Sequence, residues 1–190
     1  MGLINWTPFC TAMGLLHLLL FGLQHHTPWG WEAWAYPSEG GSGLQLFSSL
    51  TLHLNWQHLT NNAFCLFAFG TALESRIGTP RTIIIYLLSG IGGNLLFAFA
   101  ETGSAAVGAS GCLFGVICSL IFVDPKSLVI TPGAPLPIPI FIYGFFFIGN
   151  EIMALPTQDA IAHTAHIGGG LAGALVGKAL ISFKKAESAQ

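Results

Sequence analysis

Six polar side chains that lie in otherwise apolar stretches are the residues of this chain best suited to chemistry. They form three groups: His53, His58 and Asn62, then Ser110, then His163 and His166. A hydroxyl beside an imidazole is the usual arrangement for acyl transfer, because imidazole can accept the hydroxyl proton near neutral pH. Amide and imidazole N–H groups can stabilise the oxyanion that then forms. These residues therefore suggest nucleophilic catalysis by Ser110.

The elements that position these groups are expected to be membrane-spanning helices. Charged residues make up 7% of the 190-residue chain and hydrophobic residues 53%, whereas a soluble domain has about 25% charged residues. This composition predicts an all-α, polytopic integral membrane protein in contact with the lipid bilayer, with one domain over residues 1–190. The net charge of −2 provides no basic face, which excludes nucleic acid as a partner bound through its phosphates.

Six segments are apolar enough to cross a bilayer, and each break between them carries a helix-stopping signal. They cover residues 6–25, 51–73, 80–100, 108–123, 137–155 and 160–182. With alternating loops, all basic residues fall on one side: Arg76, Arg81, Lys126, Lys178, Lys184 and Lys185. The positive-inside rule then predicts that both termini are cytoplasmic, in a cell (inner) membrane.

The polar groups are expected to share one depth in the membrane. With a rise of about 1.5 Å per residue, Ser110 lies about 20 Å and His166 about 24 Å from the inner ends of their helices. On the same scale His58 and Asn62 lie about 24 and about 18 Å from the inner end of theirs. No acidic residue is expected in this layer, because Glu151 is placed at the membrane interface with a proton-relay role left open. We therefore expect a Ser–His dyad rather than a triad.

Small residues are expected to bring the last two of these groups together. Gly108, Gly111 and Gly115 surround Ser110 and permit a sharp turn and close helix approach. Gly169, Gly173 and Gly177 follow His166 at every fourth position, a pattern typical of tightly packed membrane helices. Close packing of these two segments would bring His166 toward Ser110, with Phe114 covering the imidazole ring.

These motifs together resemble the signature of rhomboid intramembrane serine proteases. The resemblance rests on Gly108-Ala109-Ser110-Gly111, on Ala165-His166-Ile167-Gly168-Gly169, and on the spacing of His53, His58 and Asn62. It extends over almost the whole chain as a six-transmembrane-helix rhomboid core.

What the resemblance implies for the site is specific. Ser110 would be the nucleophile and His166 the general base and then acid, while His58, Asn62 and the Ser110 amide would form the oxyanion hole. Supporting positions would be His53, Gly108, Gly111, Phe114, His163 and Gly169. The implied substrates are transmembrane proteins cleaved near the outer leaflet, and no cofactor or metal is implied.

Other positions compare with the family in different ways. Glu74, Arg76 and Gly78 resemble its ExRxG element, which is structural. Leu44-Gln45 stands where relatives often have a Trp-Arg pair, so the anchoring of the first outer loop cannot be carried over. Asn also occurs in bacterial relatives where this chain has His163, a difference that alters hydrogen bonding in the pocket.

Three other functions remain open at this stage. The chain could be a rhombosortase-like enzyme that processes C-terminal anchors, or a non-catalytic rhomboid-fold protein that binds membrane clients. It could also be a transporter or metal carrier, in which His163 and His166 bind a metal together with His53 or His58. The presence of both Ser110 and His166 favours the protease.

Overall fold

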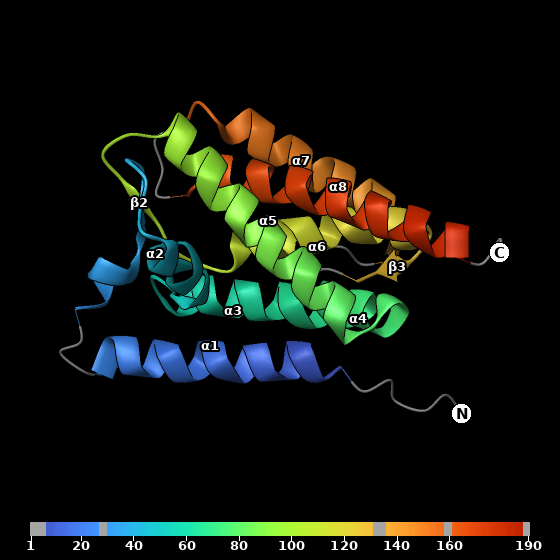
Figure 1. The fold of residues 1–190 in the computed structure, drawn as a ribbon, viewed down its shortest axis with the longest axis horizontal. Coiled ribbons are helices and arrows are strands. Elements are labelled where there is room, and N and C mark those ends of the chain that lie inside the picture. The colour runs from blue at the N-terminus through green and yellow to red at the C-terminus, as the bar shows by residue number, and fades with distance from the viewer. Residues whose placement is uncertain (1–6, 27–29, 131–135, 158–160, 188–190) are drawn as a thin grey trace.

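The computed structural model describes residues 7–26, 30–130, 136–157 and 161–187. The fold is a bundle of helices with two minimal strand pairs (Figure 1). The helices are α1 (Pro8–His26), α2 (Gly43–Ser48), α3 (Trp56–Cys65), α4 (Thr71–Ile77), α5 (Thr79–Ala100), α6 (Ser110–Val123), α7 (Ile140–Ala154) and α8 (His163–Glu187). Short helical segments are η1 (Trp31–Trp34), η2 (Ser49–Thr51) and the π-helical η3 (Leu66–Gly70).

The two strand pairs are antiparallel. Strand β1 (Tyr36–Pro37) pairs with β2 (Ala105–Ala106), with Tyr36 opposite Ala106. Strand β3 (Leu128–Val129) pairs with β4 (Ile138–Pro139), with Leu128 opposite Pro139. The first pair therefore ties the loop after α1 to the segment that leads into Ser110.

Each of the six predicted spans corresponds to a helical segment. Within the described residues, Pro8–His26, Thr79–Ala100 and His163–Ser182 are long and apolar enough to cross a membrane, and Ser110–Val123 and Ile140–Ala154 are shorter apolar helices. The remaining segment runs through α3, η3 and α4 without a break from Trp56 to Ile77. The count of six crossings stays a prediction, and the predicted boundaries at residues 6 and 160 lie outside the described residues.

The second predicted span begins later than expected. Residues 52–55 are not helical, and α3 begins only at Trp56, because the Asn55 side chain accepts a hydrogen bond from the His58 N–H at 2.9 Å and caps the helix. An Asn in this position satisfies a backbone donor that has no partner within the helix. The cap fixes the first turn of α3, which carries His58.

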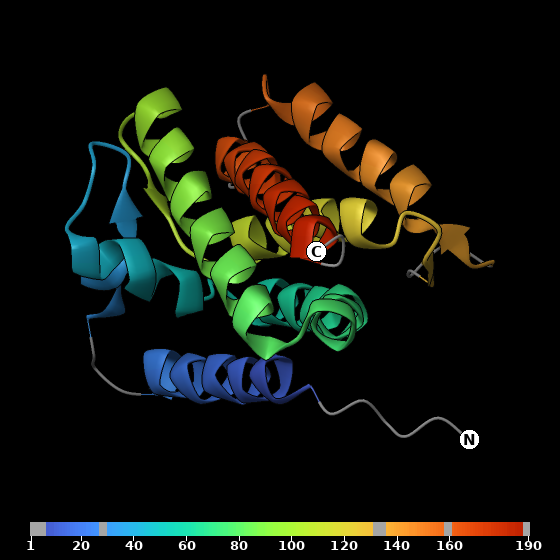
Figure 2. The same ribbon diagram turned by 45° about the vertical axis from the view of Figure 1, so that its right-hand side comes forward.

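The helices form a layered bundle in which α1 and α7 lie on opposite outer sides. Both views show α1 beside α3 and α4, and α8 between α5 and α7 (Figures 1 and 2). The start of α1 and the end of α8 lie toward the end of the bundle where β3 and α4 are, while α2 and β2 lie at the other end (Figure 1). Ser110, which begins α6 just after β2, therefore lies toward the end remote from the start of α1.

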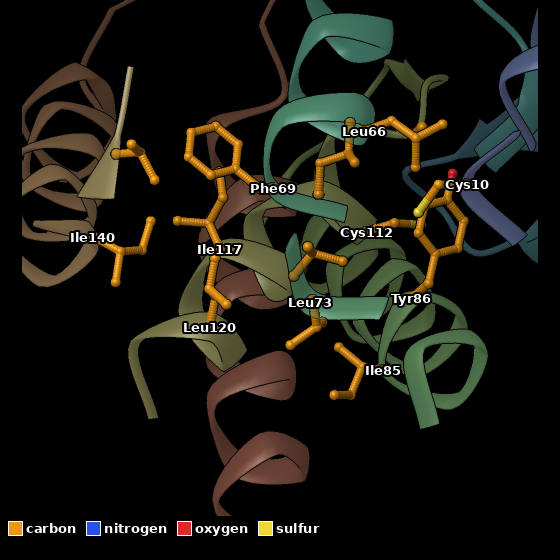
Figure 3. Packing of buried hydrophobic residues seen from close by; sticks show 14 of the residues in the cluster. Cys10, Leu66, Phe69, Leu73, Ile85, Tyr86, Cys112, Ile117, Leu120 and Ile140 are labelled. Carbon is orange, nitrogen blue, oxygen red and sulfur yellow. The ribbon is translucent and has the colours of Figure 1, made fainter. Parts of the chain in front are cut away.

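Helix α6 forms the centre of the core, since every residue from Gly111 to Leu120 is buried. Its side chains pack against α3–α4, α5 and α7 in one apolar cluster (Figure 3). Figure 3 shows Ile117 and Leu120 of α6 beside Phe69 and Leu73, with Ile140 of α7 on one flank. A helix buried on all sides cannot shift easily, because protein interiors are packed as densely as crystals. The nucleophile candidate therefore begins the most enclosed helix of the protein.

The predicted close packing of two glycine-bearing helices is confirmed. Gly169 of α8 lies against the backbone of Gly111 of α6, and Gly173 lies one turn further on against Gly115. The Ser119 hydroxyl donates to the Gly173 carbonyl at 2.7 Å. A Cβ atom at Gly169 or Gly173 would collide with the α6 backbone. This contact sets the separation between the helices that carry Ser110 and His166.

The ExRxG-like element has the structural role that was expected. The Glu74 carboxylate accepts the Phe9 and Cys10 N–H groups, each at 3.0 Å, and so places an anion at the N-terminus of α1. Arg76 donates to Asp124 at 2.7 Å, just beyond the end of α6. Gly78 has φ +82°, a left-handed conformation suited to glycine at the turn from α4 to α5. These contacts join three helices at one end of the bundle.

The loop between α1 and α3 is anchored by contacts that differ from a Trp-Arg pair. Gln45 and Ser42 form a reciprocal cap at the start of α2, and Gln45 also donates to the Ala33 carbonyl at 3.0 Å. The Asn94 side chain of α5 donates to Ser49 at 2.9 Å and to the Leu46 carbonyl at 3.1 Å. The loop is thus held both internally and against α5.

Candidate active site

Ser110 occupies the first turn of α6, immediately after a turn that needs glycine. Gly108 has φ +120°, and its N–H donates to the Ser49 carbonyl at 2.8 Å. The chain then turns into α6, whose first N–H groups have no partners within the helix. The Ser110 hydroxyl and amide therefore lie together at the positive end of a helix dipole.

His166 meets Ser110 as the sequence predicts. Its Nε2 lies 2.8 Å from the Ser110 Oγ, within hydrogen-bond distance. The ring stacks on Phe114, with centroids 4.4 Å apart and an interplanar angle of 11°. Phe147 of α7 stacks on the other side of Phe114 at 4.2 Å. These aromatic contacts restrict the orientation of the imidazole, which confirms the position expected for Phe114.

His58 and Asn62 lie next to the turn that precedes Ser110. The Leu54 N–H donates to His58 Nδ1 at 3.4 Å, which in a neutral imidazole leaves the proton on Nε2. A Cβ atom at Gly108 would meet that Nε2 at 2.6 Å, and the Asn62 Nδ2 would lie 3.6 Å away. The Asn62 Nδ2 is buried and has no hydrogen-bond partner among the described residues. Two N–H donors thus converge beside the entry to α6.

His53 supports this arrangement from behind and does not reach Ser110. Its ring is fully buried and packs edge-on against His58, with centroids 5.1 Å apart. Its backbone N–H and C=O form a pair of hydrogen bonds with the Gln24 side chain of α1, at 3.2 and 2.8 Å. His53 therefore links the first helix to the back of the His58 ring.

The expectation of a Ser–His pair without an acidic neighbour is wrong. Glu151 of α7 lies behind His166, with Oε2 2.8 Å from His166 Nδ1. The same oxygen lies 2.6 Å from His163 Nδ1. Glu151 lies in the last turn of α7 and His163 is the first residue of α8, so the end of α7 and the start of α8 lie side by side. His163 therefore contacts the same carboxylate as His166.

The same three residues offer ligand atoms for a metal ion. One atom each from Glu151, His163 and His166 lies within 4.8 Å of the other two. Two imidazoles and a carboxylate are a common zinc ligand set. This set differs from the one considered from sequence, because a carboxylate replaces His53 or His58. The hydrogen bonds from both imidazoles to Glu151 explain why these three side chains lie close together, and no metal ion is needed to explain it.

These groups line one cavity of about 740 Å³ between α3 and α7. Its polar side includes His58, Asn62, Ser110 and His166, and its apolar side includes Tyr143 and Phe147 of α7. Ligand pockets commonly combine an apolar wall with a few converging polar groups. The cavity is large enough for a short stretch of extended polypeptide.

The fold and this site together define a polytopic helical membrane protein with the side chains of a serine hydrolase. Residues 40–183 match the model of the Rhomboid domain family. The chain is 32% identical over 148 residues to RHOMBOID-like protein 6, mitochondrial, of Arabidopsis thaliana. The aligned region covers 78% of this chain and 47% of that protein. It belongs to the rhomboid family.

Two bacterial relatives have names that describe them as proteases. The chain is 33% identical over 145 residues to Rhomboid protease GluP of Bacillus subtilis, covering 74% of this chain and 26% of that protein. It is 27% identical over 188 residues to Rhomboid protease AarA of Providencia stuartii, covering 87% and 62%. The chain thus spans only part of the length of these relatives.

Proposed function

We propose that this chain is an intramembrane serine endopeptidase that cleaves transmembrane proteins near the outer leaflet. The observation that carries the proposal is the 2.8 Å contact between Ser110 Oγ and His166 Nε2 inside a cavity at the N-terminus of α6. Membership of a family that includes named rhomboid proteases supports it.

In this mechanism Ser110 is the nucleophile and His166 transfers the proton. His166 Nε2 accepts the hydroxyl proton as Oγ attacks the carbonyl carbon of the scissile bond. The same nitrogen then donates this proton to the leaving amine, which completes formation of an acyl-enzyme. Water attacks the ester in a second cycle with His166 again acting as base, and this step releases the new C-terminus and regenerates Ser110.

The oxyanion of each tetrahedral intermediate is assigned to three N–H donors. These are the Ser110 amide, His58 Nε2 and Asn62 Nδ2. Donors that are already in place before reaction stabilise the developing charge without further reorganisation. The Asn62 amide meets this requirement, because it is buried and unpartnered among the described residues. The turn at Gly108 brings all three groups to one side of Ser110.

The substrate is proposed to enter between α3 and α7. A regular helix keeps its carbonyls hydrogen-bonded, so a substrate helix must unwind locally to present a peptide bond to Ser110. The cavity lies between these helices, and Tyr143 and Phe147 form its α7 wall. Outward displacement of α7 would separate aromatic stacks from α3–η3 and α6, such as Tyr143 on Phe69. It would also separate Glu151 of α7 from His163 and His166 of α8.

A cleavage assay in liposomes tests the proposal. Wild type, Ser110→Ala and His166→Ala are reconstituted with a single-span model substrate, and product formation is followed by gel. Both variants should lose about 10³-fold or more in kcat, because the two side chains act as one unit. Cleavage by wild type that persists in Ser110→Ala would refute the assignment. A substrate anchored only at its C-terminus, run in parallel, distinguishes a general protease from a rhombosortase-like enzyme.

A further inference from the structure

A carboxylate lies behind the proposed general base, where a Ser–His dyad would have none. Glu151 Oε2 is 2.8 Å from His166 Nδ1, the ring nitrogen that faces away from Ser110. The Glu151 side chain is 14% exposed and that of His166 11% exposed, so bulk water does not compete strongly for this contact. Ser110, His166 and Glu151 therefore form a continuous chain of hydrogen bonds.

This chain fixes which nitrogen of His166 carries the proton. A carboxylate can only accept hydrogen bonds, so the proton of a neutral His166 lies on Nδ1. The Nε2 lone pair is then directed at the Ser110 hydroxyl, as a general base requires. With the proton on Nε2 instead, the imidazole could not accept the hydroxyl proton. The contact with Glu151 thus selects the tautomer that can react.

We propose that Glu151 is a positioning residue that completes a Ser110–His166–Glu151 triad. This inference rests on the proposed function and adds a third member to it. When Oγ attacks, its proton moves to His166 Nε2 while the Nδ1 proton stays in place, so the ring becomes a cation. Glu151 remains an anion throughout and stabilises that cation at 2.8 Å.

His163 holds the carboxylate in this position. Its Nδ1 donates to the same Glu151 oxygen at 2.6 Å. His163 and His166 are three residues apart on α8 and so present their rings on the same face of the helix. Two donors from α8 therefore clamp one oxygen from α7. Because Glu151 belongs to the helix proposed to admit substrate, the triad is complete only when α7 lies against α8.

A bound metal would exclude the triad. Zn²⁺ could bind the Nδ1 lone pairs of both rings in their Nε2–H tautomers, because the three ligand atoms lie within 4.8 Å of one another. A neutral His166 bound in this way would carry its single ring proton on Nε2 and could not act as a base toward Ser110. The two assignments for this cluster therefore predict opposite effects of metal on activity.

The experiment compares Glu151→Gln with a matched carboxylate variant, Glu101→Gln. Glu101 also contacts α8, through a hydrogen bond from Thr164 at 3.1 Å, but not His166. Glutamine preserves the size of Glu151, yet its NH₂ group can donate to Nδ1 and favour the wrong tautomer. We expect kcat of Glu151→Gln to fall about 100-fold or more with KM unchanged, while Glu101→Gln matches wild type.

Two further readouts separate positioning from folding. In protein with ¹⁵N-labelled histidine, the signals of His166 are identified as those that disappear in His166→Ala. In wild type these signals should show the ring proton on Nδ1. In Glu151→Gln they should show that the proton has moved toward Nε2. Glu151→Asp keeps the charge on a shorter side chain and should recover part of the lost kcat. If Glu151→Gln fails to fold, Glu151→Asp and the wild-type ¹⁵N spectrum still decide the tautomer.

The possible failures are distinguishable. If Ser110→Ala cleaves as fast as wild type, the proposed function is wrong. If Ser110→Ala is inactive while Glu151→Gln keeps wild-type kcat, the protease assignment stands and the triad is wrong. Zinc that activates wild type and binds stoichiometrically, with both effects lost in Glu151→Gln, would also overturn the triad in favour of a metal site.

Discussion

At the level of residues, His58, Asn62, Ser110 and His166 come from three helices to line one cavity. The spacing of His58 and Asn62, the GxSG stretch around Ser110 and the position of His166 lead to groups that the structure places around one cavity. Phe114 was expected over the His166 ring because it lies one helical turn beyond Ser110, and it stacks there at 4.4 Å. These predictions succeed because each depends on local helical periodicity plus one close helix contact.

The contact between Glu151 and His166 was not predicted, because the depth of Glu151 was inferred only from its position along its own helix. A carboxylate near the end of an apolar helix is usually interfacial, which made a role beside His166 unexpected. The sequence does contain a signal: Glu151 lies three residues before the end of α7, and His163 begins α8 after a short connection. Antiparallel helices joined in this way place those residues at the same depth. A contact between Glu151 and His163 could therefore have been predicted from the sequence.

The assignment of Asn62 to the oxyanion hole leads to a prediction at this scale. Asn62→Ala should lower kcat about 10²- to 10³-fold, as is typical when one oxyanion donor is removed. Its effect on stability should be small, because Nδ2 has no hydrogen-bond partner to lose among the described residues. Steady-state cleavage in liposomes measures both kcat and KM. Asn150→Ala, at an exposed position of α7, is the control, and equal rates for both variants would contradict the assignment.

At the level of elements, the glycine pattern predicts how α6 and α8 pack but not how the loop between α1 and α3 folds. Gly169, Gly173 and Gly177 of α8 recur at every fourth position, and this repeat specifies a close contact with another helix. The segment from 27 to 50 was expected only to be a loop, yet it contains η1 and α2 as well as the start of η2. Its short helices depend on Gln45, Ser48 and Asn94 contacts that join residues distant in sequence. Such contacts have no periodic signature.

The packing of α6 on α8 can be tested with a single methyl group. Gly173→Ala would place a Cβ against the Gly115 backbone and should destabilise the protein by about 1–3 kcal/mol through overpacking. Gly149→Ala on α7 meets no atom within 4 Å and should be neutral, or stabilising by up to about 1 kcal/mol. Thermal unfolding in detergent compares the two. Equal melting temperatures would show that the α6–α8 contact is not tight.

Entry of substrate beside α7 predicts that tethering this helix stops cleavage of membrane proteins. Phe146 is 63% exposed on the outside of α7, so a tether is better placed at Tyr143, which lines the cavity together with Cys65 of α3. A short bifunctional thiol reagent is applied to Tyr143→Cys with native Cys65. Transmembrane substrate cleavage should be lost, while a small fluorophosphonate still labels Ser110. Cleavage that continues after complete cross-linking would refute this route, and a monofunctional reagent is the control.

At the level of the whole molecule, the two ends of the bundle differ in chemistry. One end holds Glu74 against the start of α1, and Arg76 against Asp124. The opposite end holds Ser110 and the loop that contains α2. The sequence predicts this polarity from the positions of Lys and Arg, because charge segregation reflects orientation rather than detailed packing. It could not predict the individual pairs, which form between residues as far apart as Arg76 and Asp124.

The proposed orientation predicts which end reacts from outside the cell. Cysteine at Glu39, an exposed outer-loop position, should react with a membrane-impermeant maleimide in intact cells, whereas cysteine at the exposed Lys126 should react only after lysis. The parent chain has four free cysteines, of which Cys10, Cys112 and Cys118 are buried, and provides the background. The reverse labelling pattern would show that the termini face outward.

The most direct test of the central claim is labelling of Ser110 by a fluorophosphonate, located by mass spectrometry of the modified peptide. A serine reacts with this probe only when a neighbouring base takes its proton, so wild type should be labelled at Ser110. His166→Ala should be labelled about 10³-fold more slowly, while Glu101→Gln should match wild type. Labelling of folded His166→Ala at the wild-type rate, or no labelling of folded wild type, would contradict the proton transfer between Ser110 and His166.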